Sequence, residues 1–142
     1  MQKEIKLKAW DKIHQRMITE DEITAIYPKS KTIEILGIRG TLCYVDYIQM
    51  RKKFESDVIL LQFTGLHDKK GKEIYEGDIC IVSLSYFDIK NEKSVVIFHN
   101  GAFQFQYGCE RFFSKPYDAW DEVEVIGNIY ENPELLNGYN IV

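Results

Sequence analysis

Apolar and polar residues alternate along most of this chain, in the period-2 pattern that is typical of half-buried β-strands. Short segments of this kind recur from the N-terminus almost to the C-terminus, and turn residues separate them. We predict strands at Ile5–Trp10, Met17–Ile18, Thr32–Ile38, Leu42–Ile48, Val58–Phe63, Ile79–Leu84, Ser94–His99, Ala102–Tyr107 and Val123–Ile126. The pattern therefore predicts a mainly β fold with minor α structure, built as a small antiparallel barrel-like or sandwich core.

The stretch Leu60–Leu84 carries the strongest backbone signal in the chain. Two apolar runs flank a polar connection that holds Gly65, Gly71 and Gly77 at six-residue spacing. Glycine accepts a positive φ without a Cβ clash, so each position is expected to mark a change in chain direction. The aspartates of this stretch are expected to bond the turn backbone, Asp68 at its own turn and Asp78 at the Gly77 corner.

The pair Asn100–Gly101 predicts a two-residue β-hairpin turn, because both central positions of a type I′ turn need positive φ. That loop length fixes the register, with Phe98 facing Phe103 and Val96 facing Phe105. We expect this aromatic and aliphatic face to lie in the core.

Two short helices are predicted, one internal and one near the C-terminus. Asp46–Ser56 has apolar residues on one helical face and the basic run Arg51–Lys53 on the other. Asn132–Pro133–Glu134 is a helix-start signal, and only one turn follows it. A helix over Trp10–Tyr27 competes with the strand, loop and strand preferred there, but its apolar stripe is ragged. Turns are expected at Tyr27–Lys31 and across Gly37–Gly40.

Length and composition indicate one globular domain over residues 1–142, with a variable, insertion-like region at about 17–56. Charge is uneven: residues 1–53 carry a net +4 and the remainder carries −8. Cys43, Cys80 and Cys109 are an odd number at long separations, so we expect reduced and mostly buried thiols rather than disulfides or a zinc site. We expect neither a signal peptide nor a membrane-spanning helix.

Two acidic clusters are candidate metal sites. In the first, lysines interrupt the alternating ligand positions that a calcium loop needs. The second would need carboxylates from distant strands to converge on it. The histidines are solitary in the sequence, and no nucleophile–base pattern is present, so we expect no metal, no cofactor and no catalytic residues. The two clusters are Asp68, Glu73, Glu76 and Asp78, and Asp118, Asp121, Glu122 and Glu124.

A nucleic-acid site is the alternative hypothesis. Small β-barrels bind single strands by stacking bases on surface aromatic residues beside basic side chains. Lys6, Lys8 and Trp10 come from the first predicted strand, and Arg51, Lys52 and Lys53 form a second basic cluster. The competing interpretation buries Trp10 in the core and leaves the lysines to keep an edge strand soluble.

Three blocks of the chain resemble the YopX-like family of small proteins encoded by phages and prophages. They are Lys8–Asp11, the stretch from Gln62–Leu66 through Asp68–Ile79, and Glu124–Leu136. The resemblance implies a β-rich fold, a mobile-element origin and a cytoplasmic location in the bacterial host. It implies no activity, catalytic residue or cofactor.

These observations lead to two hypotheses about function. The first is a non-enzymatic accessory protein that binds an unknown protein partner and forms a homo-oligomer, since aromatic-rich chains suit protein interfaces. The second is a β-barrel that binds single-stranded nucleic acid through the six residues named above. Neither hypothesis involves a membrane.

Overall fold

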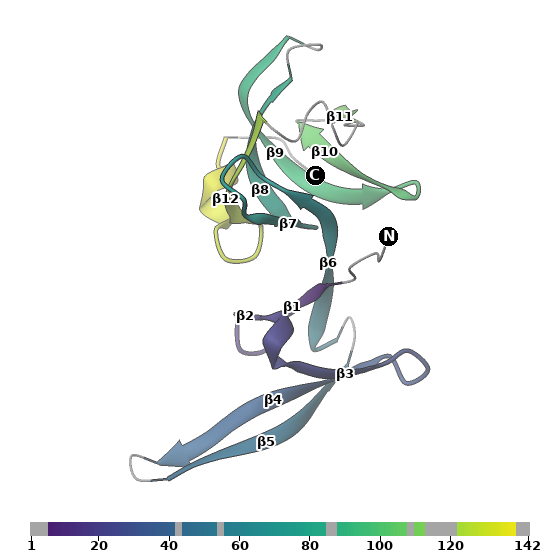
Figure 1. Ribbon diagram of the computed structural model, residues 1–142, viewed down its shortest axis with the longest axis vertical. Helices are drawn as coiled ribbons and strands as arrows, with labels where there is room; N and C mark the ends of the chain where they lie inside the picture. Colours follow the sequence, from purple (N-terminus) through teal and green to yellow (C-terminus); the bar gives the residue numbers. More distant parts are fainter. Residues whose placement is uncertain are drawn as a thin grey trace. The chain divides into compact units, whose positions relative to one another are not determined.

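The structure is a computed structural model that describes residues 6–41, 44–53, 56–84, 88–107, 110–112 and 122–138. Within these ranges the chain is mainly β, and helical structure is limited to the 3-10 turns η1 (Glu20–Glu22) and η4 (Pro133–Leu136). The chain divides into two compact units, Lys6–Leu61 and Gln62–Val142 together with the first five residues. Figure 1 labels the strands of both units. Each unit has a hydrophobic core of its own. The predicted β-rich fold is therefore confirmed.

The Lys6–Leu61 unit is built from two groups of antiparallel strands. β1 (Leu7–Asp11) pairs with β2 (Arg16–Ile18), which confirms the strand, loop and strand preferred at the N-terminus. β3 (Ile23–Tyr27), β4 (Thr32–Thr41) and β5 (Tyr44–Lys53) form a three-stranded sheet in that order. The buried core residues of the unit come from both groups and from the start of β6: Ala9, Ile18, Ile33, Ile35 and Val58.

The predicted helix over Asp46–Ser56 is wrong, because most of that segment is strand β5. β4 and β5 pair along their whole length, from Thr32 opposite Lys53 to Thr41 opposite Tyr44. Ten cross-strand pairs outweigh the weak amphipathic stripe on which the helix prediction relied. The expected turn at Gly37–Gly40 is also wrong, since these residues lie inside β4 and the chain reverses after Thr41.

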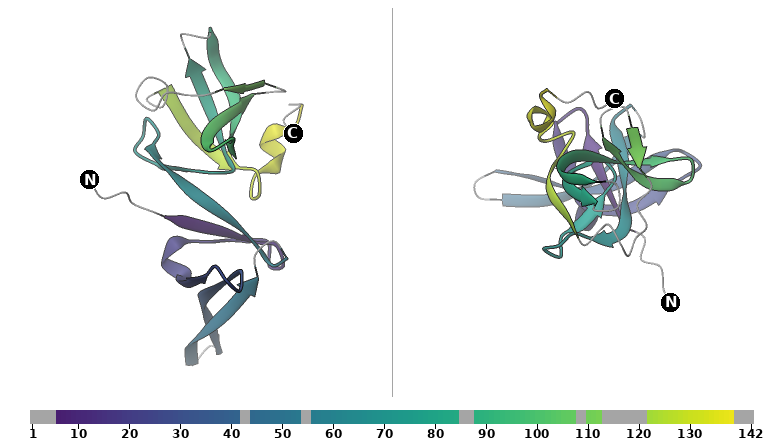
Figure 2. Two further views of the ribbon diagram at one scale, coloured as in Figure 1. Left: turned by 90° about the vertical axis from the view of Figure 1, so that its right-hand side faces the viewer. Right: turned by 90° about the horizontal axis from the view of Figure 1, so that it is seen from above.

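The second unit contains a five-stranded antiparallel sheet that curls into a half-barrel (Figure 2). Its order is β11-β10-β9-β8-β12. β6 (Val58–His67) leads into this unit, where its later residues pair with β7 (Glu73–Tyr75). The strands of the curled sheet are β8 (Asp78–Leu84), β9 (Ile89–His99), β10 (Ala102–Tyr107), β11 (Glu110–Phe112) and β12 (Val123–Asn128).

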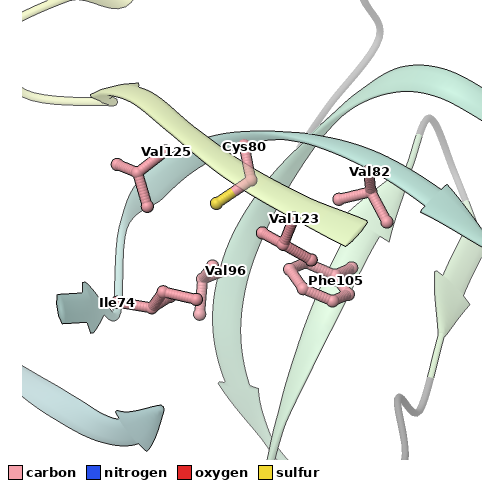
Figure 3. Packing of buried hydrophobic residues seen from close by; sticks show 7 residues of the cluster. All are labelled: Ile74, Cys80, Val82, Val96, Phe105, Val123 and Val125. Carbon is pink, nitrogen blue, oxygen red and sulfur yellow. The ribbon is translucent and has the colours of Figure 1, made fainter. Parts of the chain in front are cut away.

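The core of this unit lies on the concave side of the sheet, where side chains from several strands meet (Figure 3). Most are β-branched or aromatic, as expected for a pleated surface buried on one face. Leu66 and Phe103 are partly buried and pack against the cluster. The buried members are Ile74, Cys80, Val82, Val96, Phe105, Val123 and Val125.

Cys80 is a free, buried thiol within this core, as the cysteine count predicts. Cys43 and Cys109 lie outside the described residues. Burial raises the pKa of the Cys80 thiol, and the negative charges of Asp78 and Asp68 raise it further. We therefore expect Cys80 to resist iodoacetamide in the native protein and to react once the chain is unfolded in denaturant. Mass spectrometry of the labelled peptides measures this difference, and rapid native labelling of Cys80 would contradict it.

The Asn100–Gly101 hairpin is confirmed in both turn and register. Asn100 and Gly101 have φ values of 50° and 79°, and Phe98 and Val96 face Phe103 and Phe105. The prediction that this whole face is core is wrong at one end. Val96 and Phe105 are fully buried, but Phe98 is 49% exposed beside the turn, with its ring 5.1 Å from that of Phe103. This face of the hairpin is therefore buried at Val96 and Phe105 and exposed at Phe98, next to the turn.

Candidate functional site

The six residues predicted for nucleic-acid binding all lie in the Lys6–Leu61 unit, on or next to β1 and β5. Lys6 and Lys8 are partly exposed and Lys53 is exposed, whereas the side chain of Arg51 is not among those that the structure describes. Trp10 and Lys52 are buried, with Trp10 only 6% exposed. Base stacking needs an open aromatic face, so a buried indole is poorly placed for it. The nucleic-acid alternative stays a prediction, and flat anisotropy titrations with single-stranded DNA at low salt would reject it.

A buried carboxylate explains why Lys52 is turned inward. Asp11 ends β1 with its side chain 1% exposed, and its Oδ1 accepts hydrogen bonds of 3.0 Å from both Ile13 N–H and His14 N–H. Its Oδ2 lies 2.8 Å from His14 Nδ1 and 3.8 Å from Lys52 Nζ. Burial alone would raise the pKa of Asp11, but the hydrogen bonds from His14 and the charge of Lys52 together hold it below its ordinary value. This cluster closes the β1–β2 hairpin.

We expect Asp11→Asn to destabilise the protein by about 2 kcal/mol at neutral pH, because the buried Lys52 loses its counter-charge. A folded pKa below the unfolded value of about 3.9 stabilises the protein above that pH, and the contribution disappears as the pH falls through the folded pKa. The variant should therefore lose less stability than the wild type on acidification. Thermal melts at neutral and acidic pH measure this, with His14→Ala as the control that removes only an exposed partner. Parallel pH profiles for wild type and variant would contradict the assignment.

The first acidic cluster lies at the turns of the second unit, where Asp68 acts as a backbone acceptor. Its Oδ1 accepts from Lys70 N–H at 2.8 Å and Lys72 N–H at 2.9 Å, and its Oδ2 accepts from Val125 N–H at 3.0 Å. Asp78 Oδ2 accepts from Tyr75 N–H at 2.8 Å, across the turn that contains Gly77. The predicted structural roles of both aspartates are confirmed.

The remaining acidic residues have separate surroundings. Glu73 accepts a hydrogen bond from the Tyr75 hydroxyl at 2.9 Å, and burial raises the pKa of Glu76. In the second cluster, Glu124 forms ion pairs with Lys69 and Lys70, and Glu122 is exposed. Asp118 and Asp121 lie outside the described residues. Where side chains are described, no three histidine, cysteine or acidic residues are grouped as a metal site would require.

Of the five large apolar side chains that are exposed in the described part of the chain, three lie on β3 and β4. Ile26 and Tyr27 on β3 are 39% and 37% exposed, and Leu36 on β4 is 37% exposed. Tyr27 and Leu36 share a face with Glu34, whose Oε2 accepts from the Tyr27 hydroxyl at 3.1 Å. Ile26 lies opposite Ile33 and so belongs to the other face, at the rim of the core. We call these three residues, Ile26 on one face of the sheet and Tyr27 and Leu36 on the other, the β3–β4 apolar surface.

Comparison with known proteins adds a family to this geometry. The sequence profile described as "YopX protein" matches residues 6–137, which is nearly the whole chain and includes both compact units. The chain belongs to the YopX family. The region at about 17–56, expected to be a variable insertion, falls within the matched residues of this YopX chain.

A solved structure has the same fold as this YopX chain. It is the crystal structure of protein EF1440 from Enterococcus faecalis, with 27% sequence identity and a TM-score of 0.64. The similarity covers 95% of this chain and 99% of that one. No match was found among proteins with curated descriptions. The described residues contain no helix of the length and apolarity needed to cross a membrane.

The period-2 pattern of this YopX chain does not reveal the β3–β4 apolar surface, because it predicts no strand over Ile23–Tyr27. The signal that could reveal it is short: apolar Ile23, Ala25 and Tyr27 alternate just before Pro28. A bulge at Thr24 interrupts the alternation in the structure, since Ile23 lies opposite Ile35 but Ala25 lies opposite Glu34. Three apolar positions next to an acidic 3-10 turn are too few to predict an edge strand.

Proposed function

We propose that this chain is a non-enzymatic binding module that acts through protein–protein contacts. In this proposal it serves as a phage or prophage accessory protein in the cytoplasm of a bacterial host. The observation that carries the proposal is the β3–β4 apolar surface, whose three large side chains are each more than a third exposed on neighbouring strands. Exposed apolar and aromatic side chains on neighbouring strands at the edge of a sheet are suited to contact with another protein.

The hydrogen bonds made by three aspartates at turns favour a binding role over a catalytic one. Asp11, Asp68 and Asp78 each accept backbone N–H groups at turns. Hydrogen bonds to the ionised form lower the pKa of Asp11 and Asp68, whereas a general acid or base at neutral pH needs a pKa near the working pH. These groups are therefore suited to holding turns in place.

Affinity capture from a host-cell lysate, combined with size exclusion and light scattering, tests this function. We expect the immobilised wild type to retain one or more specific proteins, and Ile26→Glu with Leu36→Glu to abolish that retention. Ile13→Glu is the matched control, because Ile13 is 60% exposed in the same unit but lies in the β1–β2 loop. Equal retention by all three proteins would contradict the proposed surface. A strictly monomeric chain that retains nothing would contradict the function itself.

A further inference from the structure

β3 is an edge strand whose open side faces no other strand in the described part of the chain. The sheet order is β3-β4-β5, so β3 pairs with β4 on one side only. An edge strand leaves alternate backbone N–H and C=O groups directed away from its sheet, ready to pair with another strand. On β3 the exposed apolar side chains belong to both faces, Ile26 on the core face and Tyr27 on the opposite one. A partner docked on one face would cover only one of them, but an added strand would cover both.

The residues on either side of β3 carry opposite charges. The 3-10 turn η1 places Glu20, Asp21 and Glu22 immediately before the strand, and Lys29 and Lys31 lie in the turn immediately after it. Asp21, Lys29 and Lys31 are exposed. The strand thus has an acidic end and a basic end, so an antiparallel strand of the same sequence would meet each end with the opposite charge.

We propose that β3 pairs antiparallel with β3 of a second copy of this chain, across a two-fold axis that passes by Ile26. This inference rests on the proposed protein-binding function, and it identifies the bound protein as a second copy of the chain. A two-fold axis perpendicular to the sheet keeps the core face of one copy continuous with the core face of the other. Directly opposite residues must then share a face.

Within Ala25–Tyr27, only the register whose two-fold axis passes by Ile26 places residues of the same face directly opposite each other. Ile26 meets Ile26 of the second copy on the core face, and Ala25 meets Tyr27 on the opposite face, so a small side chain lies beside a large one. The same antiparallel arrangement brings the acidic η1 turn of one copy, which carries Asp21, to the end of β3 in the second copy where the turn with Lys29 and Lys31 follows. A register centred on Ala25 would instead place Tyr27 opposite Ile23, which lies on the other face because of the bulge at Thr24. Pairing through Ile26 therefore matches apolar contacts and charges together.

Sedimentation velocity on the full chain, from low to high micromolar concentration, tests the pairing. We expect a concentration-dependent dimer that weakens at high salt because part of the attraction is between exposed charges. Ile26→Glu places two like charges opposite each other and should weaken the dimer by about tenfold or more, whereas Ile13→Glu should leave it unchanged. Asp21→Lys should weaken it, and adding Lys31→Asp to that variant should restore it. A wild type that stays monomeric throughout, or a dimer indifferent to these variants, would overturn the proposal.

Cysteine cross-linking tests the register itself. Ile26→Cys should form an interchain disulfide under mild oxidation, because the two positions face each other across the axis. Ile13→Cys should not, and the wild type controls for the native cysteines. Non-reducing electrophoresis reads the result, and equal cross-linking at both positions would overturn the register. If the chain stays monomeric but still captures a host protein through the β3–β4 apolar surface, the proposed function stands and the second-copy inference falls.

Discussion

Replacing Gly77 by Val is expected to lower the stability of the protein by about 3 kcal/mol or more, or roughly 10 °C in melting temperature. Gly77 has a φ of 86°, which is costly for a β-branched side chain. Its N–H donates to Val96 O at 2.8 Å, and its C=O accepts from Ile129 N–H at 2.9 Å, so the backbone has little freedom to adjust. A Cβ built there would lie 3.0 Å from Tyr130 Cε2.

Gly71→Val is the matched control for this prediction. Gly71 has nearly the same φ, 82°, but a Cβ built there meets nothing within 4 Å. The control therefore carries the backbone cost without the collision with Tyr130, and we expect about 1–2 kcal/mol from it. Denaturant titrations of both variants separate the two effects. Equal losses at Gly71 and Gly77 would show that packing under Tyr130 contributes nothing.

Replacing Asp68 by Ala is the second change expected to have a large effect. The substitution leaves the N–H groups of Lys70, Lys72 and Val125 without their acceptor, and the bond to Val125 is fully buried. The loss of two or three such partners should cost about 3 kcal/mol. Because Asp68 joins the turn after β6 to β12, the loss should be global rather than a local loosening of the turn. Thermal and urea unfolding both measure it.

The pH dependence gives this prediction a second readout. Burial would raise the pKa of Asp68, but the hydrogen bonds from Val125, Lys72 and Lys70 together lower it below its ordinary value. Its contribution is therefore complete above about pH 4 and is lost as the pH falls through the folded pKa. The difference in stability between wild type and Asp68→Ala should shrink on acidification. Glu124→Gln removes only exposed ion pairs with Lys69 and Lys70 and should change stability little. An equally large loss in that control would contradict the special role of Asp68.

The features that the sequence predicts correctly are those determined by neighbouring residues. The Asn100–Gly101 turn needs positive φ at two adjacent positions, and that local requirement sets the register of the whole β9–β10 hairpin. Gly65, Gly71 and Gly77 likewise have φ values of 82–86°, as their spacing and surroundings indicate. The roles of Asp68 and Asp78 follow from the same turn chemistry.

The features that the sequence misses depend on distant partners. The local sequence of β5 predicts an amphipathic helix, but ten cross-strand pairs with β4 make this segment a strand. The sequence pattern does not indicate β3, because the strand has only five residues and a bulge interrupts its alternation of inward and outward side chains. The sequence leaves a stacking surface open as the alternative to a core position for Trp10, and tertiary packing places it in the interior while Lys52 turns toward Asp11. The β3–β4 apolar surface could not be predicted, since exposure follows from which strand ends the sheet.

Hydrogen–deuterium exchange at residue resolution, on dilute and on concentrated protein, tests the central claim most directly. If β3 is a protein contact, exchange at Ile23–Tyr27 should slow as concentration rises or as a captured host protein is added, because its outward amides gain partners. Exchange in β8 and β9 should stay the same, since both are interior strands of the curled sheet. Unchanged exchange in β3 under both conditions, or protection that develops in the curled sheet instead, would contradict the account.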